Sequence, residues 1–194
     1  VGLSEIVPEA AVAYLQARGA ELRFGTSVDG LACCAAAAEA VVTTAQERLT
    51  ADSYVLALPP AATAAVVPAA WPRPQLEEAP IVGVNLWYDG PIFEGDVLAA
   101  IIDGEAHWLF DRTRMLGLPG PGHHIAVSIS AAEAVMDVPR DVLASTVAAK
   151  LTRTLPGARE ARLERASVEK VRAATFVPAP GASAWRLPAR TGLR

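Results

Sequence analysis

The feature that most constrains the fold is a series of short apolar runs after about residue 70, separated by turns that contain glycine and proline. Such runs of β-branched, aromatic and small apolar residues between turns are typical of strands. A helix is predicted for 140–155, where apolar residues recur every three or four positions before Pro156-Gly157. The sequence therefore predicts a mainly antiparallel sheet with one long helix. The expected strands are 81–88, 97–102, 106–110, 125–129 and 163–171.

The first part of the chain follows a different order. Residues 6–18 predict an amphipathic helix, 21–24 a short strand, and 40–44 with 47–51 a hairpin. The run 54–58 (YVLAL) is apolar throughout, which is typical of a strand buried on both faces of a parallel sheet. The order of elements predicts an α/β part followed by an α+β part.

Composition removes several classes of protein. The 194 residues carry a net charge of −4, whereas a general nucleic-acid binder usually has a basic face. Prolines interrupt the long uncharged run 55–71, which argues against a membrane-spanning helix. The two cysteines, Cys33 and Cys34, are adjacent and have no further ligand at zinc spacing, so we predict no metal site.

The usual catalytic motifs do not assign a reaction. The chain has no G-x-G-x-x-G, no phosphate-binding G-x-x-x-x-G-K and no G-x-S-x-G, and the glycines of 117–122 are interrupted by prolines. His107 is a candidate acid or base by residue type alone. The adjacent pair His123-His124 favours a structural or solvated role, because neighbouring strand residues point to opposite faces. No catalytic residue is assigned.

Aromatic residues indicate one surface of interest. Trp87 lies in one expected strand, and Trp108 and Phe110 lie on one face of another. A sheet face lined by such side chains could hold a long hydrocarbon, although an ordinary sheet core is the alternative. In the string HWLFDRT, Asp111 and Arg112 mark the end of a strand. Arg112 either forms a structural ion pair near Asp111 or lies near a substrate hydroxyl.

Two strings of the first part carry a family resemblance. VPEAAVAYLQARGAELRFGTSVDGL and ERLTADSYVLALPP resemble flavin-dependent amine oxidases and phytoene-desaturase-like proteins. The resemblance implies an α/β plus α+β fold. Part of an FAD-binding domain of the Rossmann-like, glutathione-reductase type is joined to a substrate domain with a mixed, mainly antiparallel sheet. It also implies FAD as cofactor, with the backbone of Val28 contacting the adenine part.

Three later strings narrow the resemblance. APIVGVNLWYDGPIF, HWLFDRT and EKVRAATFVPAPG are similar to the squalene-associated FAD-dependent desaturases, the hydroxysqualene dehydroxylases of hopanoid synthesis. Placing the matching positions in the substrate pocket is our inference from strand alternation. These positions are Asn85, Trp87, Trp108, Phe110 and Arg112.

The resemblance also implies how the chain is organised. We expect residues 1–67 to be a partial FAD-binding domain, 68–171 a substrate-binding domain, and 172–194 a truncated return to the FAD-binding domain. The dinucleotide motif and the closing flavin segment of the family are absent, so we expect an internal fragment that by itself neither binds FAD tightly nor turns over.

The expected activity of the parent enzyme is FAD-dependent conversion of hydroxysqualene to squalene. A general amine oxidase or carotenoid desaturase is one alternative, and a non-catalytic lipid-binding fragment is another. Many amine oxidases carry a lysine in the strand matching 81–88, and this chain has none there, which favours an isoprenoid. The substrate would be a small isoprenoid molecule, and no nucleic-acid partner is expected. We expect a cytoplasmic protein that touches the surface of the inner membrane.

Overall fold

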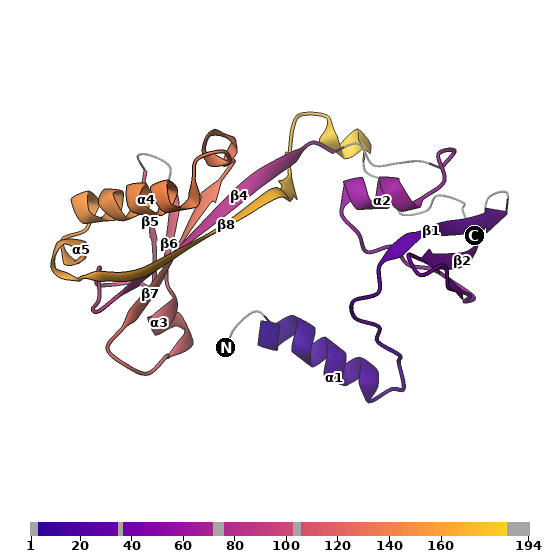
Figure 1. Ribbon diagram of the computed structural model, residues 1–194, viewed down its shortest axis with the longest axis horizontal. Coiled ribbons are helices and arrows are strands. Elements are labelled where there is room, and N and C mark those ends of the chain that lie inside the picture. Colours follow the sequence, from indigo (N-terminus) through magenta and orange to yellow (C-terminus); the bar gives the residue numbers. More distant parts are fainter. Residues whose placement is uncertain (1–3, 35–36, 72–75, 103–105, 186–194) are drawn as a thin grey trace. The chain divides into compact units, whose positions relative to one another are not determined.

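The computed structural model describes residues 4–34, 37–71, 76–102 and 106–185, and it divides the chain into two units. One unit is Glu78–Phe176, and the other combines the described parts of Gly2–Glu77 and Val177–Arg194. Each unit has its own antiparallel sheet (Figure 1). The assignment of 1–67, 68–171 and 172–194 to flavin and substrate domains stays a prediction.

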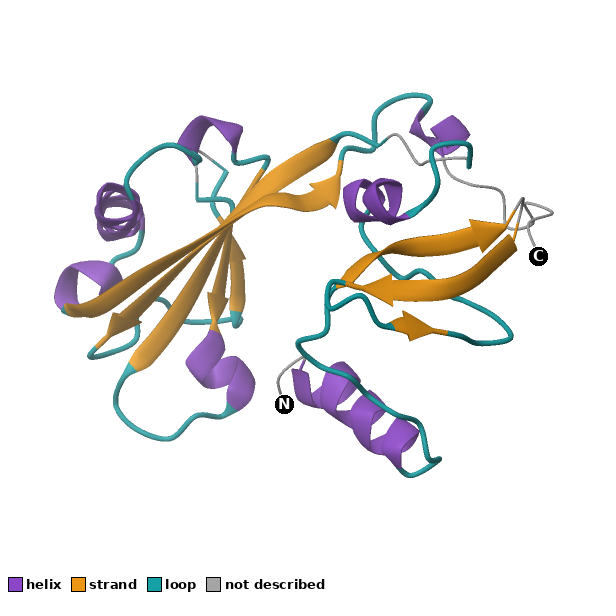
Figure 2. Ribbon diagram, turned by 45° about the vertical axis from the view of Figure 1, so that its right-hand side comes forward, coloured by secondary structure: helices purple, strands orange, loops and turns teal. Residues whose placement is uncertain are grey.

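The Glu78–Phe176 unit contains a five-stranded antiparallel sheet in the order β5-β6-β7-β4-β8. All five expected strands are confirmed, with small differences at their ends. Figure 2 shows how strongly the sheet twists, as sheets of L-residues do. The strands are β4 (Glu78–Tyr88), β5 (Leu98–Ala100), β6 (Trp108–Asp111), β7 (His123–Ser130) and β8 (Leu163–Phe176).

One face of this sheet packs on the predicted long helix, which is α4 (Arg140–Thr154). Burial along β4 alternates with a period of two, as a strand with one buried face requires. Short helices α3 (Arg112–Leu116), η2 (Glu133–Val135) and α5 (Gly157–Glu160) complete the unit. The core comprises Val82, Val84, Leu86 and Tyr88 of β4, Leu109 of β6, Ile125, Val127 and Ile129 of β7, and Leu143, Val147 and Leu151 of α4.

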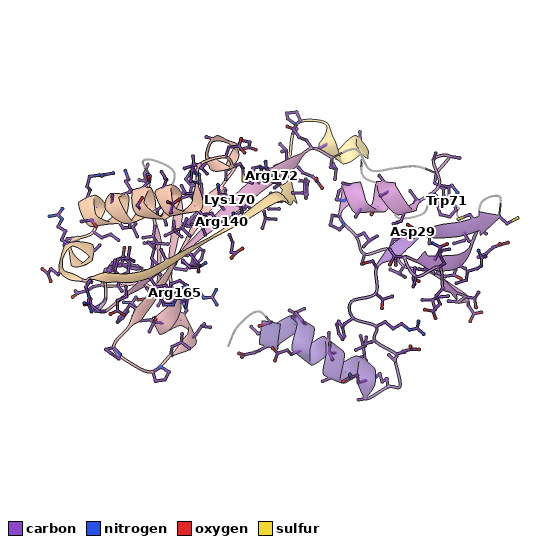
Figure 3. The ribbon with its side chains drawn as sticks, in the orientation of Figure 1. Asp29, Trp71, Arg140, Arg165, Lys170 and Arg172 are labelled. Atoms are coloured by element: carbon purple, nitrogen blue, oxygen red, sulfur yellow. The ribbon has the colours of Figure 1, made fainter. Side chains whose placement is uncertain are left out.

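Two basic side chains fasten the α4 side to the edge strand β8. The Lys170 ammonium donates to the carbonyl oxygens of Val135, Met136 and Val138, and the Arg140 guanidinium donates to that of Val168. Figure 3 shows Arg140 and Lys170 close together beside β8. Because Arg140 occupies one carbonyl of an edge strand, it also makes that edge a poorer template for another strand.

The second unit holds a three-stranded antiparallel sheet in the order β1-β2-β3. The predicted hairpin is confirmed as β2 (Ala37–Thr43) and β3 (Arg48–Leu49), with β1 (Val28–Cys34) on the other side of β2. The predicted first helix is confirmed as η1 (Glu5–Glu9) continued by α1 (Ala10–Gln16). The remaining helices are α2 (Pro60–Val66) and η3 (Ala182–Trp185).

Two predicted strands of this unit are wrong. Residues 21–24 and 54–58 have no strand structure, and Val55 is 90% exposed. An apolar run forms a buried strand only when strands on both sides satisfy its backbone groups. The three described strands of this unit pair among themselves, so 54–58 has no such neighbour. The chain instead continues into α2, whose first residue is Pro60.

Candidate functional site

The candidate site lies on the sheet face opposite α4, which we call the open face. Since Val84, Leu86 and Tyr88 point to the core, alternation places Asn85 and Trp87 on this face. Phe110 and Trp108 of β6 join them, because Leu109 between them is buried. The open face is formed by Ile81, Gly83, Asn85 and Trp87 of β4, His124, Ala126, Ser128 and Ser130 of β7, Trp108 and Phe110 of β6, and Arg165, Ser167, Glu169 and Val171 of β8.

At the centre of this face, His124 connects two of the predicted residues. Its ring stacks on the indole of Trp87, with centroids 4.5 Å apart and planes 10° from parallel. Its Nε2 lies 2.8 Å from Oδ1 of Asn85. The backbone N–H of His124 donates to Oγ1 of Thr113 at 2.8 Å. The ring is therefore positioned by a stack, a side-chain hydrogen bond and a fixed backbone.

The strand on the other side of β4 adds a cation. Arg165 of β8 pairs with Trp87 in the register, and its guanidinium carbon lies 4.5 Å from the centroid of the indole. This distance is within the range of a cation–π interaction. Trp87 is thus contacted by His124 of β7 and Arg165 of β8, and these two contacts hold its indole ring in place.

Burial and neighbouring charge keep the His124 ring neutral. Burial lowers its pKa below the ordinary 6.5, the guanidinium groups of Arg112 and Arg165 lower it further, and Asp111 acts in the opposite direction. A neutral imidazole carries one proton. Oδ1 of Asn85 faces Nε2, so the two groups form a hydrogen bond in the tautomer that carries the proton on Nε2.

At the end of β6, Asp111 pairs with Arg114 and not with its neighbour Arg112. Asp111 is 1% exposed, accepts a hydrogen bond from the backbone of Arg114 at 3.0 Å and thereby caps α3. Its Oδ2 lies 3.1 Å from Nε of Arg114, an ion pair by distance without hydrogen-bond alignment, and 3.6 Å from Nδ1 of His123. The expected structural ion pair of Arg112 is wrong, because Arg114 takes that place and the described residues include no ion-pair partner of Arg112.

The structure thus brings four of the five predicted pocket residues to one face and sets the fifth at its edge. Asn85 and Trp87 are in contact through His124, whereas Phe110 lies across β7 opposite Ala126. Trp108 is 46% exposed beside Ser128. Arg112 is exposed at the start of α3. That these residues bind substrate remains a prediction.

Sequence reasoning missed His124 as a site residue. The prediction of a structural or solvated role came from its adjacency to His123, and it considered only metal binding. Its cross-strand neighbours were the signal that could have found it. An imidazole opposite Trp87 in a neighbouring strand is a natural stacking partner. That signal needs the strand register, which the sequence did not provide.

Val28, the predicted flavin contact, begins β1 in the second unit and pairs with Thr43. It is 40% exposed, and β1 is an outer strand of its sheet. Outer strands have outward-facing N–H and C=O groups that no strand of the described unit satisfies. Such groups match the polar edge of an adenine ring, so this position fits a backbone contact to the cofactor.

No group of three or more His, Cys, Asp or Glu side chains in the described ranges could hold a metal ion. Among the helices that the structure describes, none is long and apolar enough to cross a membrane.

Comparison with known proteins decides the family. The sequence model of the flavin containing amine oxidoreductases matches residues 2–194. The chain belongs to this family. The predicted family and its flavin cofactor are thereby confirmed. The prediction that the parent protein is of the FAD-dependent oxidoreductase type is confirmed as well.

One curated relative agrees with this family. The chain is 30% identical over 192 residues to the hydroxysqualene dehydroxylase of Rhodopseudomonas palustris (strain ATCC BAA-98 / CGA009), which covers 95% of this chain and 42% of the relative. The chain therefore spans less than half the length of that curated relative.

Solved structures confirm the predicted fold class. An oxidoreductase from Methanosarcina mazei superposes with a TM-score of 0.65 at 15% identity, over 84% of this chain and 41% of that one. Putrescine oxidase, solved with putrescine bound, superposes with a TM-score of 0.58 at 17% identity, over 82% and 38%. At these identities the likeness concerns the fold.

Proposed function

We propose that the chain is the middle part of an FAD-dependent oxidoreductase that acts on a long isoprenoid, and that its reaction is the reduction of hydroxysqualene to squalene. The observation that carries the proposal is the chemistry of the open face. Aromatic side chains line part of it, and β4 has Gly83 and Asn85 but no lysine, whereas many amine oxidases carry a lysine in the matching strand. The relative from Rhodopseudomonas palustris supports the same substrate.

A long hydrocarbon gains most of its binding free energy from apolar contact. Burial of apolar surface contributes about 25 cal/mol per Å², and aromatic side chains offer large areas at small entropic cost. Trp108 is half exposed and Phe110 half buried, so both retain surface for a ligand. Gly83 adds space, because a Cβ at this position would have no neighbour within 4 Å. The open face therefore suits an apolar ligand with few polar groups.

The two units would divide the work in the whole protein. We propose that residues 1–67, with Val28, contribute to holding FAD, that 68–171 bind the substrate, and that 172–194 return to the flavin domain. Replacing a carbon–hydroxyl bond by a carbon–hydrogen bond needs two electrons and two protons and releases water. Bound flavin would supply the electrons when it is reduced. The residues of this chain would orient the isoprenoid and exclude water from it. A substrate of this kind resides in membranes, so we propose that the protein works at the inner membrane surface from the cytoplasmic side.

The experiment that tests the proposal is reconstitution. The chain and a version extended by the flanking flavin segments of its gene are purified, and the visible absorbance of bound flavin is recorded for each. The extended protein is then reduced without oxygen and given hydroxysqualene or, in a parallel reaction, putrescine. We expect flavin in the extended protein, squalene as product, and no amine oxidation.

Two results would contradict the proposal. Oxidation of the amine with no squalene formed would favour a general amine oxidase. An extended protein that binds no flavin but retains squalene would favour a lipid-binding fragment. The visible spectrum and the product analysis separate these cases, since the first requires bound flavin and the second does not.

A further inference from the structure

We propose that Asn85 is the hydrogen-bond donor that recognises the oxygen of the substrate, and that His124 is the residue that positions it. The inference rests on the proposed function, since it assumes that the open face holds an isoprenoid bearing an oxygen. It adds a place for that oxygen and a role for a histidine that the family resemblance did not single out.

The first argument is the position of Asn85. From Ile81 to Trp87, all of which the structure describes, β4 presents Ile81, Gly83, Asn85 and Trp87 on the open face. Asn85 is therefore the polar side chain in the middle of an otherwise apolar stretch. It is half buried, and Ala126 and Ser167 are its direct partners in the two neighbouring strands. A polar group in such a place costs free energy unless something bonds to it.

The second argument is the number of hydrogen bonds that Asn85 makes. A side-chain amide has one acceptor oxygen and a nitrogen with two donors. The oxygen is engaged with Nε2 of His124 at 2.8 Å. The described residues offer no partner to the amide nitrogen. Its two N–H groups are therefore available to an acceptor that arrives over the open face, such as a hydroxyl oxygen.

The third argument is what fixes the orientation of the amide. The two ends of an asparagine side chain are almost equal in size, so hydrogen bonding decides which end points where. In the structure the oxygen end of the amide faces Nε2 of His124. With the imidazole proton on Nε2 this orientation is held, and the nitrogen end is turned to the open face. Stacking on Trp87 and the backbone bond to Thr113 hold the imidazole in place. His124 therefore acts on the substrate through Asn85.

The substrate would lie across the strands under this arrangement. Its oxygen would meet Asn85 on β4, and its hydrocarbon would continue over Ala126 of β7 to Phe110 of β6, which are direct neighbours in the register. Trp108 lies farther along β6 on the same face. The product, which has lost the oxygen, would retain the apolar contacts and lose the hydrogen bond.

The difference between substrate and product provides the test. Binding of hydroxysqualene and of squalene to the flavin-loaded full-length protein is measured by equilibrium dialysis in detergent micelles, with no turnover required. A hydrogen bond in a site shielded from water contributes about 1–2 kcal/mol, which corresponds to about a 5- to 30-fold preference for hydroxysqualene. Asn85→Leu removes the donor and is close to asparagine in size. We expect this variant to lose the preference and to bind squalene as the wild type does.

His124 is tested by replacements that keep different parts of the ring. His124→Phe keeps the stack on Trp87 and removes Nε2, so we expect most of the preference to be lost. His124→Gln keeps a donor near Asn85 and should restore part of it, which a purely structural role would not predict. Thr154→Ala is the control, because Thr154 ends α4, away from the open face, and its hydroxyl donates to the carbonyl of Lys150. Its loss should leave the preference unchanged.

The outcomes separate this inference from the proposed function. A wild type that prefers hydroxysqualene and an Asn85→Leu variant with the same preference would overturn the inference and leave the proposed function intact. A wild type that binds neither ligand would overturn the proposed function and the inference with it. An unchanged preference in His124→Phe together with a lost preference in Asn85→Leu would remove the positioning role of His124.

Discussion

Tyr88 offers a sharp test of the packing beneath the open face. It is the last residue of β4, its ring belongs to the core, and it is 2% exposed. Its hydroxyl group has no hydrogen-bond partner among the described residues. Burial raises the pKa of this hydroxyl from the ordinary 10.0 to about 12. We therefore predict that Tyr88→Phe stabilises the protein, and more so at alkaline pH.

The size of the effect follows from two contributions. At neutral pH the substitution removes a buried hydroxyl without a partner, whose burial costs about 1–3 kcal/mol, while the small void left behind returns part of that gain. A net stabilisation of about 1 kcal/mol is expected. A pKa two units above the ordinary value corresponds to about 2.7 kcal/mol.

The sign of the alkaline contribution is set by the raised pKa of Tyr88 in the folded protein. The folded state holds the proton more tightly than the unfolded state, so ionisation favours unfolding. This contribution to stability is fully present below pH 10 and is lost as the pH rises toward about 12. At about pH 11 the wild type should have lost about 1.4 kcal/mol from this source, and the phenylalanine variant nothing.

The assay is urea unfolding of wild type and variant at neutral pH, about pH 9 and about pH 11, followed by near-ultraviolet circular dichroism. Tyr54→Phe is the control, because the Tyr54 hydroxyl donates to the carbonyl of Glu39 and accepts from the backbone of Ala51. That variant should be destabilised by about 1 kcal/mol. A Tyr88→Phe variant that is destabilised, or whose advantage is the same at about pH 9 and 11, would refute the reasoning about the buried hydroxyl.

Three further predictions concern other parts of the same unit. Asp111→Ala should lower the free energy of unfolding by about 2–4 kcal/mol, because it removes the cap of α3 and the carboxylate beside Arg114; Asp111→Asn, which keeps a capping oxygen, should lower it less in the same urea experiment. Gly157→Ala should cost about 1–3 kcal/mol, since its Cβ would lie 2.7 Å from the carbonyl oxygen of Ile92; Gly83→Ala, whose Cβ would meet nothing within 4 Å, should change the melting temperature little. The His124 ring should titrate by NMR with a midpoint below 6.5. Its neutral form therefore adds stability that is lost as the pH falls below 6.5. Arg112→Gln should raise the midpoint, because it removes a nearby positive charge.

Local patterns in the sequence predicted the elements of the Glu78–Phe176 unit well. The strand 81–88 and the helix 140–155 were predictable because each repeats its apolar residues with the period of its own secondary structure. The run 54–58 was misjudged because burial on both faces depends on neighbouring strands, and a single segment carries no information about them. Val55 illustrates this, since its apolar character suits a sheet interior that the described residues do not supply.

The candidate site was predictable in part for the same physical reason. Alternation alone placed Asn85 and Trp87 on one face, and Trp108 with Phe110 on one face of another strand. Alternation could not pair the strands, so it could not bring His124 to Asn85 and Trp87. Nor could it choose between Arg112 and Arg114 as the partner of Asp111, because that choice depends on the turn into α3.

The inner strand β4 explains why this face can combine apolar binding with recognition of one polar group. Val82, Val84 and Leu86 lie on the core side of β4 and pack in the core with residues of β7 and α4. Their burial fixes the register in which β4 pairs with β7. A slip by one residue would turn these side chains away from the core, so the core that stabilises the unit also determines which residues reach the open face. Gly83 leaves space there, and Asn85 follows it as an amide with unpaired donors. A hydrocarbon that carries one oxygen matches that sequence of space and donor, because its hydroxyl oxygen can accept a hydrogen bond from the amide of Asn85.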